Sequence, residues 1–508
     1  MQKVCTMQTK EGSSEDMLPF DPVTVLLSII VCIFLVTVLY KKKEDVPQNY
    51  PPGPKPLPII GNILNLDIEK AHLSFLELAK KYGPVYSIKV GVQKMVVLCG
   101  YDTVREALVN HAEEFAERPT TPIFTDITKG YGLIFSRGHN SKAMRRFTLS
   151  TLRDFGMGKR TLEDKINEES NRLVETIKSY KGEPFDNNMI MNAAVGNIIV
   201  SILLGHRFDY NDPKLQRLLT IIRDIIRIGG SPMALLYNAF PSLMRWIPGS
   251  HKTLRPTIDE FNSFVREVFT KQRDQLDVND QRNLIDCFLV KQKEEKPNPE
   301  LYFHDGNLTT LVTDLFSAGM ETTSTTLRWG ILLMMKYPDV QEKVQKEIEK
   351  VIGSAEPQLV HRQHMPYTDA VVHEIQRFSD ITPFVARETT QDVILKGFFI
   401  PKGTHIVGSL TSVLRDPKYF QKPNEFYPQH FLDSEGNFVR SEAFIPFSAG
   451  RRSCAGENLA KMELFIFFTK LLQNFTFKSP LGAKLDFNPI IGITLAPRKH
   501  EICAISRN

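Results

Sequence analysis

The feature that most constrains this chain is a glycine-containing loop around Cys454, which a helical pattern follows directly. Residues 444–456 read FIPFSAGRRSCAG. Apolar residues then recur at helical spacing, which predicts a helix over residues 455–474. The positive end of a helix dipole favours an anion by about 0.3–1 kcal/mol, and Cys454 stands at that end. The loop therefore offers one of the six cysteines as a candidate metal ligand.

Five residues of this loop fit the pattern F-x-x-G-x-R-x-C-x-G: Phe447, Gly450, Arg452, Cys454 and Gly456. Glycine lets the backbone bend and approach a flat ligand closely, and arginine offers fixed donors to a carboxylate. A buried structural role is the commoner interpretation of a single cysteine, but five specified positions before a helix favour a ligand site. The pattern resembles the haem-binding signature of the cytochrome P-450 superfamily. That resemblance implies haem b, with Cys454 as the axial thiolate and with Phe447, Gly450 and Arg452 at the cofactor.

A second motif lies in a long helical segment, residues 305–336, and reads AGMETT at positions 318–323. A glycine costs a helix interior about 1 kcal/mol relative to alanine, so Gly319 needs a reason. The Thr322 hydroxyl can bond the Ala318 carbonyl and bend the helix, and a local opening there would admit dioxygen. A polar helix face is the commoner interpretation of such a run alone. The run resembles the superfamily's oxygen-activation motif, which implies that Thr322 and Glu321 manage protons as catalytic residues.

A third set of residues resembles the scaffold of the same family. Glu374 and Arg377 lie three apart on a helical stretch and share a face. The family carries this pair buried and clamped to a downstream loop, which here reads FYPQHF with His430 as its basic residue. The resemblance implies a structural role for these three residues. It also implies that other arginines join Arg452 at the haem propionates, namely Arg118, Arg145 and Arg387.

One position departs from the family pattern. The family has W-x-x-x-R on a helix over the propionates, whereas residues 139–147 read HNSKAMRRF. Arg145 holds the basic position, but Ser141 stands where tryptophan is expected. A propionate donor and a large packing surface are missing there, which bears on haem retention rather than on the iron chemistry.

The N-terminal part of the chain predicts a membrane anchor. Residues 23–40 carry no charge, and a helix of that length reaches about 27 Å, close to the roughly 30 Å of a bilayer core. Three lysines follow at once, which places the bulk of the chain in the cytoplasm. A cleaved signal peptide would carry its basic cluster before the apolar run. We expect a short lumenal tail, a single transmembrane helix, a basic stop with a proline-rich hinge, and a haem-thiolate catalytic domain, over residues 1–22, 23–40, 41–62 and 63–508.

The remainder predicts one large, mainly α-helical domain with small β-sheets, which is the cytochrome P-450 fold by resemblance. Expected helices cover residues 72–81, 162–179, 218–228, 257–273, 305–336, 340–352 and 455–474. Expected strands cover residues 85–90, 95–98, 393–395, 398–400 and 404–409. The apolar segment 233–247 is broken by Pro241, so it is either core or pocket roof, or a second membrane contact beside a substrate entrance.

The chain must take its electrons from outside, because it has no GxGxxG or P-loop to hold a flavin or nicotinamide. A formal net charge of +5 does not argue for nucleic-acid binding. The runs FGMGKR and PFSAGRRSCAGE resemble family 2 of the vertebrate microsomal enzymes. That resemblance implies the endoplasmic reticulum membrane and its lipids, and NADPH–cytochrome reductase as donor, with cytochrome b5 as a second candidate. A basic patch would receive the donor, although a solvated charged face is the commoner interpretation of each member: Lys142, Arg145, Arg146 and Arg451.

The implied reaction inserts one oxygen atom of O2 into a lipophilic substrate: a xenobiotic, a fatty acid such as arachidonic or lauric acid, or a steroid. By resemblance, substrate would touch six apolar or small residues, each also a reasonable core residue: Phe135, Ala318, Ile381, Phe384, Val385 and Ile493.

Three alternatives stay open from the sequence alone. NADPH-dependent turnover would exclude an isomerase or a peroxide-driven haem enzyme. A thiolate-type carbon monoxide complex without substrate oxidation would support a non-catalytic haem protein or membrane interaction module. A zinc protein is suggested by His361 and His364, but no third ligand lies nearby at metal-site spacing.

The departure at position 141 gives a first prediction. Ser141→Trp restores an indole N–H donor and a large packing surface beside the propionates, so it should slow haem loss. The measurement is the rate of haem transfer from the purified variant to excess apomyoglobin. A rate equal to that of the wild type would refute this interpretation of position 141.

Overall fold

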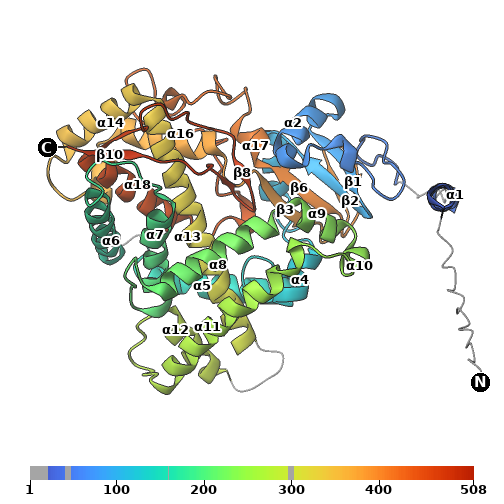
Figure 1. Ribbon diagram of the computed structural model, residues 1–508, viewed down its shortest axis with the longest axis horizontal. Helices are drawn as coiled ribbons and strands as arrows, with labels where there is room; N and C mark the ends of the chain where they lie inside the picture. Colours follow the sequence, from blue (N-terminus) through green and yellow to red (C-terminus); the bar gives the residue numbers. More distant parts are fainter. Residues whose placement is uncertain (1–20, 40–46, 158–159, 296–301, 508) are drawn as a thin grey trace, which may run out of the picture.

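The computed structural model describes residues 21–39, 47–157, 160–295 and 302–507. Helices make up most of these ranges, as the sequence predicts (Figure 1). The α-helices are α1 Pro22–Leu39, α2 Ala71–Tyr82, α3 Tyr101–Arg105, α4 Pro122–Thr128, α5 Gly138–Asp154, α6 Arg160–Lys178, α7 Asn188–Leu204, α8 Pro213–Gly229, α9 Pro232–Ala239, α10 Pro241–Met244, α11 Leu254–Asp274, α12 Leu284–Glu294, α13 Asp305–Lys336, α14 Pro338–Val351, α15 Leu359–Arg362, α16 Pro366–Ser379, α17 Leu410–Leu414 and α18 Glu457–Asn474. Short 3-10 turns cover Ile63–Asn65, Ile68–Lys70, Ser250–Lys252, Pro428–Phe431 and Gly450–Arg452, and a π-helical turn covers Glu106–Asn110.

The β-structure is small and lies beside the helical body. One four-stranded sheet has the order β1-β2-β6-β3, in which β2 and β6 run parallel and the other pairs run antiparallel. Its strands are β1 Val85–Val90, β2 Gln93–Leu98, β6 His405–Ser409 and β3 Phe384–Glu388. Three two-stranded sheets pair β4 Val393–Leu395 with β5 Phe398–Ile400, β7 Phe475–Lys478 with β10 Cys503–Ser506, and β8 Ile490–Ile491 with β9 Leu495–Ala496. β3 matters most for the site, because it carries residues of the central cavity.

Every helix and strand expected from the sequence is present, with ends that differ by a few residues. Helix α13 has the predicted bounds, as do β1, β4 and β5. The list of expected helices omitted α5 and α7 among others. Helix α7 is buried on nearly every side, so it has no polar face to give an amphipathic pattern.

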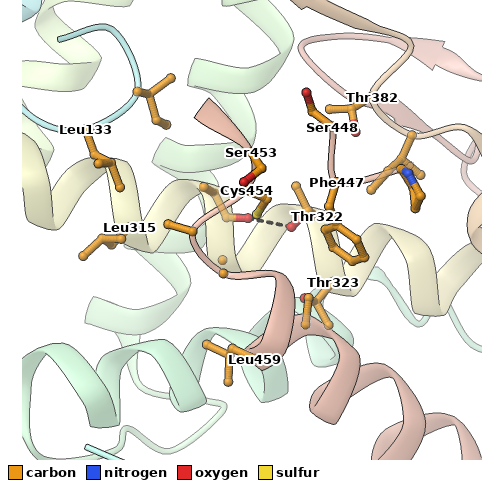
Figure 2. A pocket seen from close by; sticks show the side chains of 18 of the residues that line it. Leu133, Leu315, Thr322, Thr323, Thr382, Phe447, Ser448, Ser453, Cys454 and Leu459 are labelled. Carbon is orange, nitrogen blue, oxygen red and sulfur yellow. Dashed lines mark hydrogen bonds between the residues drawn. The ribbon is translucent and has the colours of Figure 1, made fainter. Parts of the chain in front are cut away.

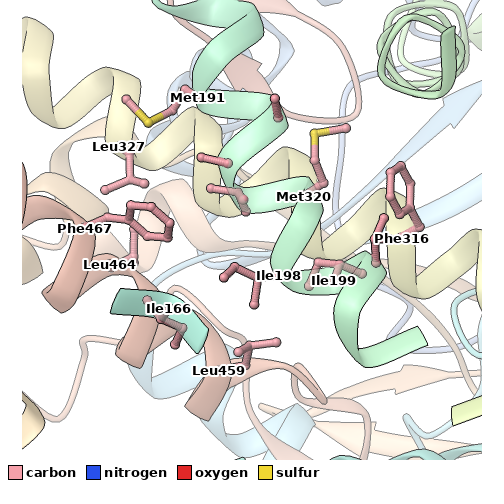
Figure 3. Close-up of a cluster of buried hydrophobic side chains, with 14 of the residues drawn as sticks. Ile166, Met191, Ile198, Ile199, Phe316, Met320, Leu327, Leu459, Leu464 and Phe467 are labelled. Atoms are coloured by element: carbon pink, nitrogen blue, oxygen red, sulfur yellow. The ribbon is translucent and has the colours of Figure 1, made fainter. Parts of the chain in front are cut away.

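The core that positions the site is a set of packed helices. Helix α13 runs through the centre of the molecule, and α7 and α18 pack against it, with α6 against both of those (Figure 1; Figure 3). Gly319 lies where α13 meets α7, because a Cβ there would come 2.6 Å from Cδ1 of Ile199. The glycine in the α13 motif is therefore explained by close helix packing.

The predicted anchor coincides with α1 up to Leu39, while Tyr40 lies outside the described residues. Apolar side chains of this helix are exposed, including Val23, Leu26, Ile30 and Leu35. Among the helices that the structure describes, none is both long and apolar enough to span a bilayer. The transmembrane assignment is therefore unconfirmed.

The predicted scaffold clamp is present and completely buried. Arg377 donates from Nε and Nη2 to the two carboxylate oxygens of Glu374, at 2.7 Å each. The same guanidinium donates to the backbone carbonyls of Leu414, Pro423 and Glu425 at 2.7–2.9 Å. A Glu374 oxygen lies 3.2 Å from Nδ1 of His430. The clamp thus fixes the chain between α17 and the Cys454 loop onto α16.

Breaking this clamp should be costly. In Arg377→Ala, Glu374 becomes a buried charge without its cation, and we expect a loss of about 3–5 kcal/mol in unfolding free energy. Chemical denaturation measures the loss. The matched control is Arg217→Ala, which removes an exposed ion pair with Glu260 and should cost no more than about 1 kcal/mol. Equal costs for the two variants would contradict the clamp's role.

Candidate functional site

Cys454 opens onto a cavity of about 360 Å³ in the centre of the molecule. The loop that carries it is closed by a hydrogen bond from the Cys454 backbone N–H to the Phe447 carbonyl at 3.0 Å. Side chains from α13 and from the loop around residues 133–134 face the same space (Figure 2). Residues of β3 line it as well. The sequence-predicted ligand and the predicted distal helix therefore meet at one cavity.

The protein environment alone does not favour a thiolate at this position. Burial raises the pKa of Cys454, and the nearby Glu457 carboxylate raises it further. A backbone hydrogen bond from Gly456 and the charge of Arg145 lower the pKa, but they do not offset the effect of burial. A thiol of raised pKa deprotonates readily only when a cation binds to the sulfur. Cys454 is therefore suited to metal ligation rather than to free nucleophilic chemistry.

The two loop glycines act differently from each other. Gly450 has φ +74°, and a Cβ there would lie 1.8 Å from the Leu108 carbonyl oxygen. The bend that the sequence predicts is present, but the close approach is to backbone, and Gly450 is not among the residues that line the cavity. A Cβ at Gly456 would lie 3.9 Å from the Cys454 sulfur, so this glycine keeps the space beside the sulfur open.

All four predicted propionate arginines line this cavity: Arg118, Arg145, Arg387 and Arg452. Within the part of the chain that the structure describes, their hydrogen bonds go to neutral oxygens. Arg118 and Arg387 both donate to the Ala386 carbonyl at 2.9 Å, and Arg145 donates to the Ser453 hydroxyl at 3.3 Å.

None of these four arginines forms an ion pair with a carboxylate among the described residues, and the Glu117 charge acts on Arg452 alone. Burial, and then repulsion from Arg452 and Arg145, lowers the pKa of Arg387 to about 9. Burial, and then the other three arginines, lowers the pKa of Arg118 well below its ordinary value, and its Nε is buried without a partner. Buried cations are stable only beside anions. The cluster therefore fits a ligand with carboxylates, and together with Cys454 it fits a haem with two propionates.

Helix α13 presents the predicted threonine to the cavity. The Thr322 hydroxyl donates to the Ala318 carbonyl at 2.7 Å, as the sequence predicts (Figure 2). Ala318 and Thr322 both line the cavity. Because the hydroxyl proton is used in the helix, the oxygen of Thr322 is left as an acceptor on the cavity side.

Glu321, the neighbour of Thr322 in the motif, does not line the cavity. Its side chain is buried. Its Oε1 accepts hydrogen bonds from Thr494 at 2.9 Å and Thr325 at 3.1 Å. Burial raises its pKa, against the effect of these two hydroxyls and of Arg328. The structure thus separates the two residues that the sequence motif places side by side.

Four of the six predicted substrate contacts line the cavity: Ala318, Ile381, Phe384 and Val385. Phe135 instead stacks on Phe124, with ring centroids 4.4 Å apart, while its neighbours Leu133 and Ile134 line the cavity. Ile493 is bonded through its backbone N–H to Ile226 of α8 and is not among the lining residues. The lining is mainly apolar, which suits a lipophilic ligand.

Three buried carboxyl groups at the cavity were not identified from the sequence: Asp314, Asp380 and Glu463. Burial raises their pKa values to about 6, 7 and 8 respectively. Each has one oxygen bonded, to backbone N–H groups at Asp314 and to a threonine hydroxyl at the other two. The available signal was an acidic residue within an apolar helical run, and Asp314 and Glu463 both show it.

The predicted basic patch is divided between the surface and the cavity. Lys142 and Arg146 of α5 are exposed, but Arg145 lines the cavity. Arg451 is exposed and forms an ion pair with Glu113. The two histidines behind the zinc alternative make local contacts, His361 in a helix cap and His364 with Gln363. No group of three potential metal-ligating side chains occurs among the described residues.

Comparison with known proteins identifies the family. A family model described as cytochrome P450 matches residues 51–504. The chain belongs to the cytochrome P450 family. This P450 is 44% identical to cytochrome P450 2K1 of Oncorhynchus mykiss over 500 residues, which cover 97% of this chain and 99% of that protein. It is 47% identical to cytochrome P450 2K6 of Danio rerio, over 89% of this chain and 90% of the relative. It is also 47% identical to cytochrome P450 2C14 of Oryctolagus cuniculus, over 93% and 96%.

These relatives make this P450 a family-2 type monooxygenase, an oxidoreductase. The family implies a haem iron bound by a thiolate. The resemblance seen in the Cys454 loop and in α13 is thereby confirmed at the level of the family.

The buried carboxyl Glu463 gives a pH prediction. Its pKa is raised from 4.5 to about 8 by burial, so the folded state holds a proton that the unfolded chain releases above pH 4.5. Folding stability should therefore fall as pH rises from 5 to 7.5, by roughly 3 kcal/mol at 1.36 kcal/mol per pKa unit. Glu463→Gln cannot ionise and should be spared this loss, as chemical denaturation across the pH series would measure. Glu342→Gln, at an exposed site, is the matched control. A stability difference between wild type and Glu463→Gln that stays constant with pH would contradict the assignment.

Proposed function

We propose that this chain is a haem b monooxygenase that inserts one oxygen atom of O2 into lipophilic substrates, using electrons from NADPH delivered by a reductase. One observation carries the proposal: the Cys454 sulfur and four arginines that have no carboxylate ion pair among the described residues face one mainly apolar cavity. A cation at the sulfur and two carboxylates at the arginines would satisfy both requirements together.

In this proposal Cys454 would ligate the haem iron, and Arg118, Arg145, Arg387 and Arg452 would donate hydrogen bonds to the propionates. Phe447 lines the cavity beside the sulfur. Bound haem supplies the oxidising chemistry, in which a thiolate ligand favours cleavage of the O–O bond. The protein contributes orientation, electrostatics and the exclusion of water.

Proton handling falls to α13. The Thr322 oxygen is free to accept a hydrogen bond at the cavity, since its proton is donated to Ala318. Glu321 is the nearby acid of the motif, with a pKa raised by burial. To serve the cavity, its carboxyl must exchange the hydrogen bonds of Thr325 and Thr494 for one toward Thr322. A side-chain rearrangement of Glu321 is therefore part of the proposed relay.

The substrate site is the apolar part of the same cavity. Ala318, Ile381, Phe384 and Val385 would contact substrate there, with Leu133 or Ile134 in the place that the sequence assigned to Phe135. Such a lining selects for apolar surface rather than for a charged group. Xenobiotics, fatty acids such as arachidonic or lauric acid, and steroids are the substrate classes to screen.

Electron donors would dock near α5, where Lys142 and Arg146 are exposed. NADPH–cytochrome reductase is the proposed donor and cytochrome b5 a second candidate. Opposite charge on the donor would speed association and make turnover sensitive to ionic strength.

Attachment to the endoplasmic reticulum membrane is proposed through two apolar surfaces. The first is α1, whose described apolar side chains are exposed. The second is the end of the 233–247 segment, where Leu243, Ile247 and Trp246, the last 85% exposed, follow a part that is buried at Ala234 and Ala239. Gly91 packs against Ala239 and Phe240 of the same segment, and the next residue, Val92, is exposed. Exposed apolar groups of this extent favour a lipid surface.

The decisive test is Cys454→Ser. The wild-type holoprotein should give a thiolate-type ferrous–carbonyl spectrum and, with reductase and NADPH, oxidise at least one member of a panel of lauric acid, arachidonic acid, steroids and alkoxyresorufins. The serine variant should lose the thiolate-type band and this turnover, because an alcohol is a far weaker ligand for iron than a thiolate. Cys503→Ser, which lies outside the cavity, is the matched control and should keep both. Purified chain without porphyrin, or an unaltered spectrum in Cys454→Ser, would overturn the proposal.

A further inference from the structure

Ser141, the residue that replaces the family's tryptophan, makes a specific contact. It lies on α5, is only 4% exposed, and is not among the residues that line the cavity. Its hydroxyl oxygen accepts a hydrogen bond from Nη1 of Arg452 at 2.5 Å. Ser141 therefore does more than fill space, because its hydroxyl is the acceptor for one end of the Arg452 guanidinium.

The other end of the Arg452 guanidinium is equally engaged. Nη2 donates to the carbonyl of Ser136 at 3.1 Å and to those of Leu133 and Ile134 at 3.4 Å each. We call residues 130–136 the cavity loop, because Leu133 and Ile134 within it line the cavity. One guanidinium thus joins α5, the Cys454 loop and the cavity loop.

The cavity loop is held from its other side by α13. The backbone N–H groups of Leu133 and Ile134 donate to one carboxylate oxygen of Asp314, at 2.7 and 2.9 Å. The N–H of Gly132 donates to the Asn307 side chain at 2.8 Å. The cavity loop is therefore held from two sides. Asp314 accepts hydrogen bonds from its N–H groups, and Arg452 donates hydrogen bonds to its carbonyl groups. The hydrogen bonds to the loop carbonyls therefore depend on the position of the Arg452 guanidinium.

We propose that Ser141 is a positioning residue, whose hydroxyl fixes Arg452 so that carboxylate binding at the arginine cluster is coupled to the conformation of the cavity loop. The coupling rests on the proposed function, in which Arg452 is a propionate partner. A buried donor left without an acceptor is unfavourable, so its side chain moves to where another acceptor is available. Without the Ser141 oxygen, and with no new donor in its place, the guanidinium would turn, and its contacts with both the loop carbonyls and the propionate would weaken. Ser141→Trp also removes this acceptor, but its indole N–H would donate to a propionate directly, so the slower haem loss expected of that variant comes from a new bond to the ligand.

Ser141→Ala tests this in the full-length holoprotein. Hydrogen exchange at the Leu133 and Ile134 amides reports the loop directly, because those two N–H groups are the ones bonded to Asp314. We expect exchange at these amides to rise by about tenfold or more, with the amides in the middle of α13 unchanged, and haem transfer to apomyoglobin to be several times faster. A purely structural role for Ser141 would instead raise exchange throughout the core.

Two control variants complete the design. Ser141→Thr keeps the hydroxyl and should retain slow exchange and slow haem transfer. Ser150→Ala removes a hydroxyl from the same helix that bonds only carbonyls of its own turn, and it should leave both readouts unchanged. Ser141→Ala with wild-type exchange at Leu133 and Ile134 would overturn the inference, as would an equal rise at every core amide.

The outcome is separable from that of the proposed function. A chain that holds no haem gives no haem-transfer signal, and the proposed function then fails together with the coupling to propionate binding. The exchange measurement would still test the link from Ser141 through Arg452 to the loop. A chain with normal haem and a thiolate-type spectrum, but with unaltered loop exchange in Ser141→Ala, would reject this inference alone.

Discussion

A concentration of positive charge around one cavity sets the requirements of this structure. Four guanidinium groups from separate parts of the chain surround one cavity, and their hydrogen bonds go to neutral oxygens rather than to carboxylates in the described residues. Isolated buried charge is among the most unfavourable features that a folded protein can carry. Such a cluster is reasonable only if a ligand brings the missing negative charge. The cofactor is thus part of the electrostatic balance of the fold.

Contacts within the scaffold hold those arginines and the Cys454 sulfur in place. The Glu374–Arg377 clamp fixes the chain between α17 and the Cys454 loop, and α13 packs on α7 closely enough to need Gly319. The close approach of Gly450 to the Leu108 backbone seats the Cys454 loop against the turn after α3. Each of these contacts helps to determine where a ligand group stands.

The cavity also contains ionisable groups whose charge depends on their surroundings. Asp314 accepts two backbone N–H groups and fixes a wall of the cavity, whereas Glu463 has one oxygen without a partner. Glu321, which the motif places next to Thr322, faces Thr325 and Thr494 instead. Neighbouring positions on a helix point about 100° apart, so adjacency in a motif does not bring two side chains to one site. The ionisable groups at and near this cavity therefore come from several elements.

The sequence by itself indicated the candidate metal ligand, Cys454, and the main helices. Cys454 could be singled out because five residue types stand at fixed spacing before a helix, and α13 could be bounded because its pattern is local. Contacts between distant segments were decided only by the tertiary structure. Three contacts illustrate this: Phe135 stacks on Phe124, Glu321 bonds Thr494 outside the cavity lining, and Arg452 donates to Ser141. No local sequence pattern links the residues of these pairs. Periodicity and motifs report local geometry, whereas burial and charge pairing arise only when remote segments pack together.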